Sequence, residues 1–261
     1  MNIATSNNLV KIIIPIYSDH LKDSESVSLR QCIKVLSAYP ISFIKPRRLE
    51  LKNISKKYPE ISIETFDDNY FKSVESYNRL MLSSSFYERF SDFEYILIYQ
   101  LDAYVFRDEL KEWCQKGYDY IGAPWIPRGL FWKNIRDNLN KLIGNNKREV
   151  SKTLYYKVGN GGFSLRKVNS FHKITSSEKD LIHSYLYPED KNNKFLAEDV
   201  FWALEPHRRG YKFSIPNYKE ALLFSFDKYP RECFQISQTI PFGCHAWDRK
   251  KALPFWENYI K

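Results

Sequence analysis

The sequence predicts an α/β fold with a mostly parallel central sheet flanked by helices. Short apolar runs alternate with amphipathic stretches up to residue 99, and this alternation is typical of parallel strands covered by helices. Residues 95–99 (YILIY) are apolar throughout, as in a strand buried on both faces. Ligands of such sheets bind beyond the carboxyl ends of the strands, so polar residues that follow a strand are candidate site residues.

The expected elements follow one another at short spacing. Strands are predicted at residues 11–17 (KIIIPIY), 41–46 (ISFIKP), 61–66 (ISIETF) and 95–99, and helices at residues 26–38 and 74–90. After Phe106 the alternation ends, and no repeat or change in composition marks a linker. We therefore expect one domain over residues 1–261, with two halves of different function that meet near residue 103.

Composition and charge narrow the class of protein. The 261 residues are 43% apolar and 16% aromatic, which is enough for a sizeable core. The formal net charge is +9 and the isoelectric point is about 9.2. This excess of basic residues favours an acidic partner, such as a nucleotide, a phosphorylated lipid surface or a nucleic acid.

The cysteines and the apolar runs indicate a cytoplasmic protein. Cys32, Cys114, Cys233 and Cys244 show no CxxC spacing, so neither a zinc knuckle nor a redox pair is expected. The apolar run at residues 9–17 is too short for a signal peptide or a membrane span, and no later window is long and apolar enough to span. A membrane would be contacted at its surface only.

Asp102 and His245 are candidate metal ligands. Asp102 follows the apolar run 95–99 and Gln100, and a carboxylate at such a position needs a partner. It is either a paired or capping residue of the core or the ligand of a cation. His245 lies in the aromatic-rich turn PFGCHAW and is either a hydrogen-bonded core histidine or a second ligand. Aspartate and histidine together suit manganese when substrate phosphates complete the coordination.

The glycine-rich segment GNGG, residues 159–162, has two interpretations. Glycine tolerates positive φ and leaves space for another chain or a ligand to approach closely. The alternative is an ordinary Asn-Gly hairpin turn.

Glu198 and Asp199 precede VFWAL and fall in the first turn of a predicted helix. Acids at that position stabilise the helix dipole by about 0.3–1 kcal/mol, and one of them is also a candidate general base.

Residues 130–148 form a basic amphipathic pattern. Such a helix packs its apolar face on its own domain or lies on an anionic membrane.

Five motifs in a fixed order resemble the bacterial DUF5672 family of glycosyltransferase-like proteins with the GT-A fold. They are YQLDAYVFRDEL, YDYIGAPW, VGNGGFSLR, AEDVFWA and PFGCHAW, spread over residues 99–247. The resemblance implies a single GT-A-type domain in which residues 1–103 bind the nucleotide and a smaller half, residues 104–261, carries the acceptor and catalytic groups.

The resemblance also implies a metal and donor site. Asp102 resembles the last acid of a DxD motif in which Gln100 replaces the first acid, and His245 resembles the C-terminal histidine that completes a site for Mn²⁺ or Mg²⁺. The donor is expected to be a nucleotide-sugar, a UDP-sugar in the first instance. The expected donor-binding residues are Pro15, Tyr17, Gln100, Asp102, Gly161 and Gly162.

Asp199 resembles the acid of an xED motif that deprotonates the acceptor, with Glu198 beside it. The implied reaction is an inverting, metal-dependent sugar transfer to a hydroxyl of a bacterial surface polysaccharide or a lipid-linked oligosaccharide. The expected location is the cytoplasm, with peripheral contact at the inner face of the cell membrane as an open alternative.

Two other functions remain open from the sequence. The first is a binding-only relative that has kept the fold and lost turnover, for which Gln100 is the best argument. The second is a basic nucleic-acid-binding protein. No RNP-like motif or arginine-rich run supports it, so no nucleic-acid partner is expected.

Overall fold

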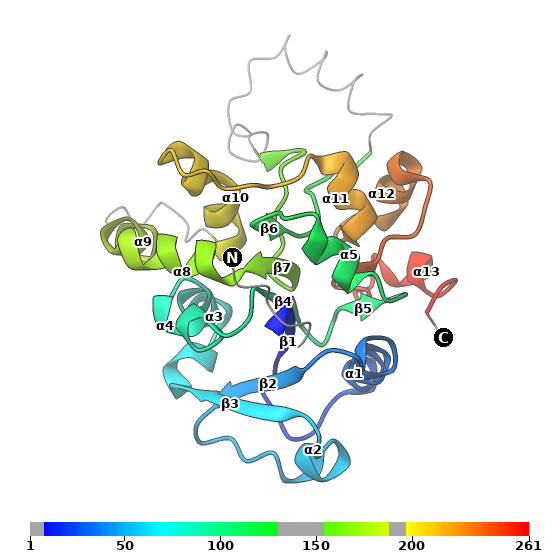
Figure 1. Cartoon of the computed structure of the whole chain (residues 1–261). Helices are drawn as coiled ribbons and strands as arrows, with labels where there is room; N and C mark the ends of the chain where they lie inside the picture. The colour runs from blue at the N-terminus through cyan, green and yellow to red at the C-terminus, as the bar shows by residue number, and fades with distance from the viewer. Residues whose placement is uncertain (1–7, 130–153, 188–196, 261) are drawn as a thin grey trace.

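A computed structural model of the chain describes residues 8–129, 154–187 and 197–260 (Figure 1). The basic segment predicted at residues 130–148 lies outside these ranges. The strands are β1 (Val10–Pro15), β2 (Ile41–Pro46), β3 (Ser62–Phe66), β4 (Tyr95–Tyr99), β5 (Tyr104–Val105), β6 (Tyr120–Ile121), β7 (Phe163–Lys167), β8 (Ser225–Phe226) and β9 (Gly243–Cys244). The helices are α1 (Asp23–Leu36), α2 (Lys52–Lys57), the 3-10 helix η2 (Asp68–Phe71), α3 (Val74–Met81), α4 (Ser84–Glu88), α5 (Leu110–Gln115), α8 (Val168–Ser177), α9 (Lys179–Leu186), α10 (Glu198–Arg208), α11 (Tyr218–Phe224), α12 (Pro230–Ser237) and α13 (Leu253–Trp256).

The larger sheet is mostly parallel, as predicted. Its strand order is β3-β2-β1-β4-β7-β6. β2 pairs in parallel with β3 and β1, and β1 pairs in parallel with β4. β7 runs antiparallel to both β4 and β6. The carboxyl ends of β1 and β4 therefore lie side by side, next to the amino end of β7.

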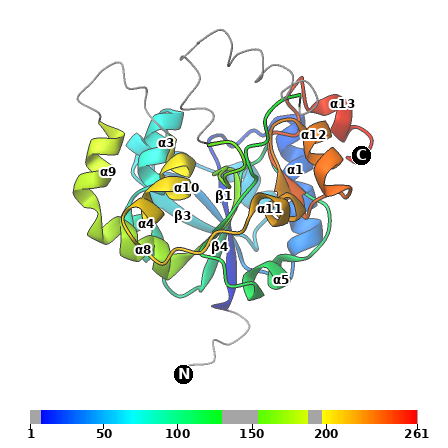
Figure 2. The same ribbon diagram turned by 90° about the horizontal axis from the view of Figure 1, so that it is seen from above.

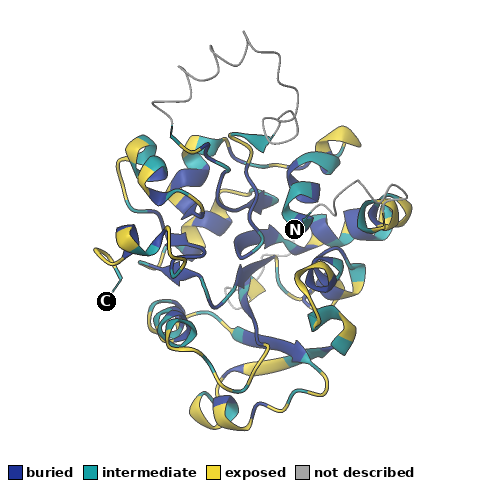
Figure 3. Cartoon of the chain, turned by 180° about the vertical axis from the view of Figure 1, so that it is seen from behind, coloured by how far each residue is buried: buried dark blue, intermediate teal, exposed yellow. Residues whose placement is uncertain are grey.

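Helices cover both faces of this sheet (Figure 2). Along β4, Tyr95, Leu97 and Tyr99 belong to a core cluster that includes residues of α1 and α5, whereas Ile96 and Ile98 belong to one that includes residues of α3, α4, α8 and α10. This alternation follows from the two-residue period of a strand. The central strands are consequently buried on both faces (Figure 3). Burial on both faces explains why residues 95–99 are apolar without interruption.

Most predicted elements of the N-terminal half are confirmed, with one correction. The strands predicted at residues 41–46 and 95–99 have the predicted bounds, and β1 ends at Pro15, two residues before the predicted end. The single helix predicted at residues 74–90 is wrong, because α3 ends at Met81 and α4 begins at Ser84. Ser83 between them is extended, and serine side chains compete with helical hydrogen bonds and favour helix starts.

A second, smaller sheet is built from three short strands in the order β5-β9-β8. β9 pairs antiparallel with β5 and parallel with β8. An apolar cluster that includes residues of α11, α12 and α13 packs against it. This sheet was not predicted, because strands of two residues are too short to show a periodic pattern.

No helix within the described ranges is long and apolar enough to cross a membrane.

We predict that Phe163 is a main packing contact between the two sheets. Its ring is fully buried and contacts the rings of Tyr99, Phe224 and Phe242 at centroid distances of 5.8, 5.2 and 5.5 Å. Phe163→Ala should lower the free energy of unfolding by about 3–5 kcal/mol, measured by denaturant unfolding. The control is Leu223→Ala on α11, where the side chain is 41% exposed. Similar losses for the two variants would contradict the prediction.

Candidate active site

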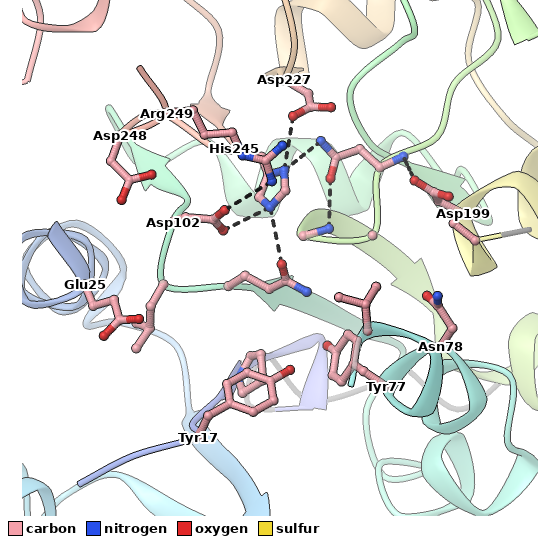
Figure 4. A pocket seen from close by; sticks show the side chains of 18 of the residues that line it. Tyr17, Glu25, Tyr77, Asn78, Asp102, Asp199, Asp227, His245, Asp248 and Arg249 are labelled. Atoms are coloured by element: carbon pink, nitrogen blue, oxygen red, sulfur yellow. Dashed lines mark hydrogen bonds and ion pairs between the residues drawn. The ribbon is translucent and has the colours of Figure 1, made fainter. Parts of the chain in front are cut away.

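A cavity of about 860 Å³ opens at the carboxyl ends of β1 and β4. This is the edge of the sheet at which the sequence predicts ligand binding. Figure 4 shows its side chains from close by. All of the predicted site residues line it, namely Pro15, Tyr17, Gln100, Asp102, Gly161, Gly162, Glu198, Asp199 and His245.

The small sheet brings Asp102, Asp227 and His245 together. In the parallel pair β8 and β9, Phe226 lies opposite Cys244, so the next residues along the two strands, Asp227 and His245, are neighbours. In the antiparallel pair β5 and β9, Tyr104 lies opposite Cys244. The chain just before Tyr104 therefore passes His245, and the backbone N–H of Trp247 donates to the Asp102 carbonyl at 3.3 Å.

The imidazole of His245 is buried, with polar partners on both nitrogens (Figure 4). Its Nε2 lies 3.0 Å from Oδ1 of Asp102 and 3.3 Å from Oε1 of Gln100. Its Nδ1 lies 3.2 Å from Oδ1 of Asp227 and 3.2 Å from Nδ2 of Asn160. Nδ1 therefore has a partner in either protonation state, since the Asn160 amide can donate to its lone pair and Asp227 can accept from its N–H.

These contacts shift the pKa of both partners. Burial of His245 disfavours the imidazolium, but hydrogen bonds to Asp102 and Asp227 outweigh it and raise the pKa of His245 to about 9. Burial of Asp102 favours its neutral form, but the hydrogen bond and charge of His245, with the nearby Arg249, lower the pKa of Asp102 below its ordinary value. Asp102 is thus a carboxylate at neutral pH.

The segment 159–162 is a close-approach loop and not a hairpin turn. It leads into β7, whose partners β4 and β6 are distant in sequence. A Cβ on Gly162 would lie 2.1 Å from Nε2 of His245, and one on Gly161 would lie 2.0 Å from Oε1 of Glu198. Asn160 adopts a left-handed backbone with φ of 72°, which asparagine tolerates better than most residues. Only glycine fits at 161 and 162 without displacing a site side chain.

Asp199 lies in the first turn of α10, as predicted. Its Oδ1 accepts from the backbone N–H of Val200 at 2.8 Å, and its Oδ2 accepts from the backbone N–H of Asn160 at 3.1 Å. Burial raises the pKa of Asp199 above its ordinary value, although these two hydrogen bonds oppose the shift. The result is an oriented carboxylate in the cavity wall with increased basicity, which suits a proton acceptor.

Glu198 has a different environment from its neighbour. Its Oε1 lies 2.8 Å from Nη2 of Arg166, and both side chains are almost fully buried. Arg166 also donates to the Tyr87 hydroxyl and to Ser164 Oγ, each at 3.0 Å. Burial raises the pKa of Glu198, and the charge of Arg166 opposes that shift. This network ties the start of α10 to β7 and α4.

The opposite end of the cavity is aromatic. Tyr17 follows β1 and is 52% exposed, and its ring lies edge-on to Phe71 and Tyr77 at centroid distances of 5.8 and 6.3 Å. Val74 beside them is 77% exposed and also lines the cavity. An exposed tyrosine face at the end of the first strand is a surface on which a flat base can stack.

Several cavity residues were not predicted from the sequence. Asp227 and Arg249 belong to none of the motifs, and they reach the site only through strand pairing and a turn. Arg166, which lies behind the cavity wall and pairs with Glu198, carried a signal, because a charged residue inside an apolar strand such as FSLR requires a buried partner. Both basic and acidic side chains line the cavity, and the acids outnumber the bases, so its charge alone does not select an anionic ligand. The basic residues are Lys22, Lys72, Lys228 and Arg249, and the acidic ones are Glu25, Asp102, Glu198, Asp199, Asp227 and Asp248.

Among the described residues, no group of three or more His, Cys, Asp or Glu side chains is spaced to hold a metal ion. The donors that converge are one carboxylate, one imidazole nitrogen and one amide oxygen, from Asp102, His245 and Gln100. Such a set is sufficient for a hard divalent ion only when substrate oxygens complete the coordination.

Solved structures with a similar fold are glycosyltransferases. Galactosyltransferase LgtC, in complex with donor and acceptor sugar analogs, is 15% identical with a TM-score of 0.53, over 95% of this chain and 94% of that one. Core-mannan synthase A (CmsA/Ktr4) from Aspergillus fumigatus, in a Mn/GDP form, is 10% identical with a TM-score of 0.53, over 78% and 70%. A glycosyltransferase involved in glycosylation of the major capsid of PBCV-1 is 12% identical with a TM-score of 0.51, over 94% and 96%. At these identities the similarity establishes the fold alone.

The molecule thus has a glycosyltransferase-like fold of the GT-A type. The chain belongs to DUF5672, a family described as protein of unknown function, whose model matches residues 60–245. No curated protein matches the sequence.

The buried pair of Arg166 and Glu198 generates a stability prediction. Arg166→Met leaves the Glu198 carboxylate buried without its cation and should cost about 3–5 kcal/mol of unfolding free energy. Adding Glu198→Gln should recover part of that loss, because no unpaired charge remains. The control is Arg208→Met on α10, the helix that carries Glu198. Arg208 is largely exposed and lies 2.7 Å from Glu205, so its loss should cost less than about 1 kcal/mol. Strictly additive losses in the double variant would contradict the prediction.

Proposed function

We propose that this protein is an inverting, metal-dependent glycosyltransferase that moves a sugar from a nucleotide-sugar to an acceptor hydroxyl. The observation that carries the proposal is the meeting, in one cavity at the carboxyl ends of β1 and β4, of Asp102 and His245 with the oriented carboxylate of Asp199. The fold supports it, since proteins of similar structure are glycosyltransferases.

The donor set fits a divalent ion. Nε2 of His245 is 3.0 and 3.3 Å from its two oxygen partners, similar to the roughly 3 Å between adjacent ligands that each lie about 2.1 Å from an octahedral ion. Asp102 and His245, with Gln100 beside them, would hold Mn²⁺ or Mg²⁺, and the proton that the raised pKa of His245 keeps on the imidazole at neutral pH would be released to solvent as the ion binds. When bound, such an ion stabilises the negative charge that develops on the departing nucleoside diphosphate.

The protein's own residues would bind and orient the donor. Tyr17, after Pro15, offers its exposed ring to the base. The backbone of Gly161 and Gly162 lines the cavity beside Glu198 and His245, where the diphosphate and sugar would contact it. Arg249 and Lys228 line the same cavity and would neutralise phosphate oxygens. We propose UDP as the nucleotide, with GDP as the alternative that the Mn/GDP form of core-mannan synthase A suggests.

Asp199 would act as the general base. As the acceptor oxygen bonds to the anomeric carbon, the bond from that carbon to the phosphate oxygen breaks, its electron pair leaves with the diphosphate, and Asp199 takes the hydroxyl proton. This is a single displacement with inversion. Glu198, held by Arg166, would fix the start of α10 so that Asp199 faces the acceptor. We propose that residues 1–103 form the nucleotide half of one domain and residues 104–261 the acceptor half.

The proposed acceptor is a surface polysaccharide or lipid-linked oligosaccharide, and the proposed location is the cytoplasm, at or near the inner face of the membrane. The excess of basic residues supports an anionic surface as a neighbour. The second candidate function is a nucleotide- or glycan-binding relative with little turnover. Gln100, which lowers the negative charge at the metal site, is the observation that favours it.

The metal site makes a direct prediction. UDP or GDP should raise the melting temperature of the wild-type protein only with Mn²⁺ or Mg²⁺ present, because the diphosphate and the ion bind as a unit. Asp102→Ala and His245→Ala should abolish this effect. Asp92→Ala, at an exposed position before β4, should keep it. Equal stabilisation with and without a chelator would exclude the site as described.

The role of Asp199 is tested by separating binding from rate. Asp199→Asn should keep the fold and nucleotide affinity, since the amide has the same shape and its oxygen still accepts the hydrogen bond from the backbone N–H of Val200, although the bond from Asn160 is lost. Sugar transfer should fall by roughly 100- to 10,000-fold, because the amide cannot take the acceptor proton. The measurement is single-turnover transfer from the donor that binds, with nucleotide affinity measured in parallel. A fully active variant would rule out Asp199 as the base, and a product of retained anomeric configuration would rule out single displacement.

A further inference from the structure

Asp227 contacts Nδ1 of His245, the ring nitrogen opposite the one proposed to bind the metal. Their positions follow from the parallel register of β8 and β9, and the backbone N–H of His245 donates to the Phe226 carbonyl at 2.9 Å. Asp227 is 8% exposed and His245 is 9% exposed. In the described part of the chain, the carboxylates within ion-pair distance of this imidazole are those of Asp102 and Asp227. Asp102 contacts Nε2 of the imidazole and Asp227 contacts Nδ1.

The charged oxygen of Asp227 favours a hydrogen on Nδ1 over the alternative in which the neutral Asn160 amide, also 3.2 Å away, donates to the Nδ1 lone pair. Oδ1 of Asp227 lies 3.2 Å from Nδ1, and a carboxylate accepts only from an N–H. When Nδ1 carries the hydrogen, the lone pair of a neutral imidazole is on Nε2, the nitrogen that faces Asp102 and Gln100. Carboxylates in this position fix the ring and increase the basicity of the coordinating nitrogen.

Asp227 also adds negative charge near the proposed metal site. Gln100 supplies a neutral oxygen on the Nε2 side, where Asp102 is the sole carboxylate within ion-pair distance in the described structure. Arg249 lies 3.8 Å from the other oxygen of Asp102 and offsets part of that charge. Asp227 places a second negative charge one imidazole ring away, where it favours a cation at Nε2.

We propose that Asp227 is a positioning residue that orients His245 for metal binding and supplies the negative charge that Gln100 leaves out. The inference rests on the proposed function. Asp102 then contributes one negative charge to the metal site as a ligand, and Asp227 contributes a second through the imidazole of His245.

The test measures Mn²⁺ affinity, not turnover. Mn²⁺ is titrated into the full chain with saturating UDP, or GDP if that nucleotide binds, and free Mn²⁺ is measured by electron paramagnetic resonance. Asp227→Asn keeps an acceptor for Nδ1–H and removes the charge, whereas Asp227→Ala removes both. We expect affinity to fall about 10-fold in the first and up to about 100-fold in the second. Asp92→Asn is the exposed control, and denaturant unfolding without ligand checks that each variant is folded.

A compensating substitution tests whether the lost affinity of the Asp227 variants comes from the lost charge or from a change in folding. Gln100→Asp should restore the Mn²⁺ affinity of Asp227→Asn to near the wild-type value, because it returns a carboxylate to the Nε2 side. Wild-type affinity in Asp227→Ala, or no recovery in the Gln100→Asp, Asp227→Asn double variant, would overturn the inference and leave the proposed function standing. Failure of the wild-type protein to bind Mn²⁺ with either nucleotide would overturn both.

Discussion

The buried imidazole of His245 is the constraint on which the arrangement of the site depends. A polar ring removed from water needs partners on both nitrogens, and here they come from distant parts of the chain, with Gln100 145 residues and Asp227 18 residues away in sequence. The strand pairings of β5, β9 and β8 satisfy this requirement. Because Gln100 and Asp102 directly follow β4 of the large sheet, the same contacts hold the small sheet at the carboxyl end of β4. One side chain thus meets a structural need and supplies the geometry that we propose for metal binding.

Limited space is the second constraint. Gly161 and Gly162 pass so close to Glu198 and His245 that any side chain would displace one of them. The side-chain amide of Asn160, the residue before these glycines, makes two contacts. Its oxygen accepts from the backbone N–H of Gly162 at 2.8 Å, and its nitrogen lies 3.2 Å from Nδ1 of His245. The backbone N–H of Asn160 donates to the carboxylate of Asp199. The loop therefore links the side chains proposed for metal binding to the proposed base through one asparagine, and its sequence is explained by packing as well as by the ligand.

The sequence predicted the parts of this structure that local pattern determines. Apolar runs at residues 41–46 and 95–99 define β2 and β4 within the bounds observed, and the acids before VFWAL define the start of α10. The break between α3 and α4 was missed because the apolar spacing continues through the serines at 83–85. The different environments of Glu198 and Asp199 could not be predicted either, since they depend on Arg166 in another strand. The family motifs led to Asp102 and His245, but Asp227 is visible only in the register of two strands that are each two residues long.

The proposed function depends on Asp102 and His245 binding a divalent ion together with a nucleoside diphosphate. The most direct measurement is a crystal structure of the protein grown with Mn²⁺ and UDP, with anomalous diffraction used to locate manganese. We expect one strong peak within about 2.0–2.3 Å of a carboxylate oxygen of Asp102 and of Nε2 of His245, with diphosphate oxygens completing the coordination and Asp227 still hydrogen-bonded to Nδ1. A diphosphate bound in the cavity while Nε2 of His245 remains hydrogen-bonded to Asp102, with no manganese between them, would contradict it.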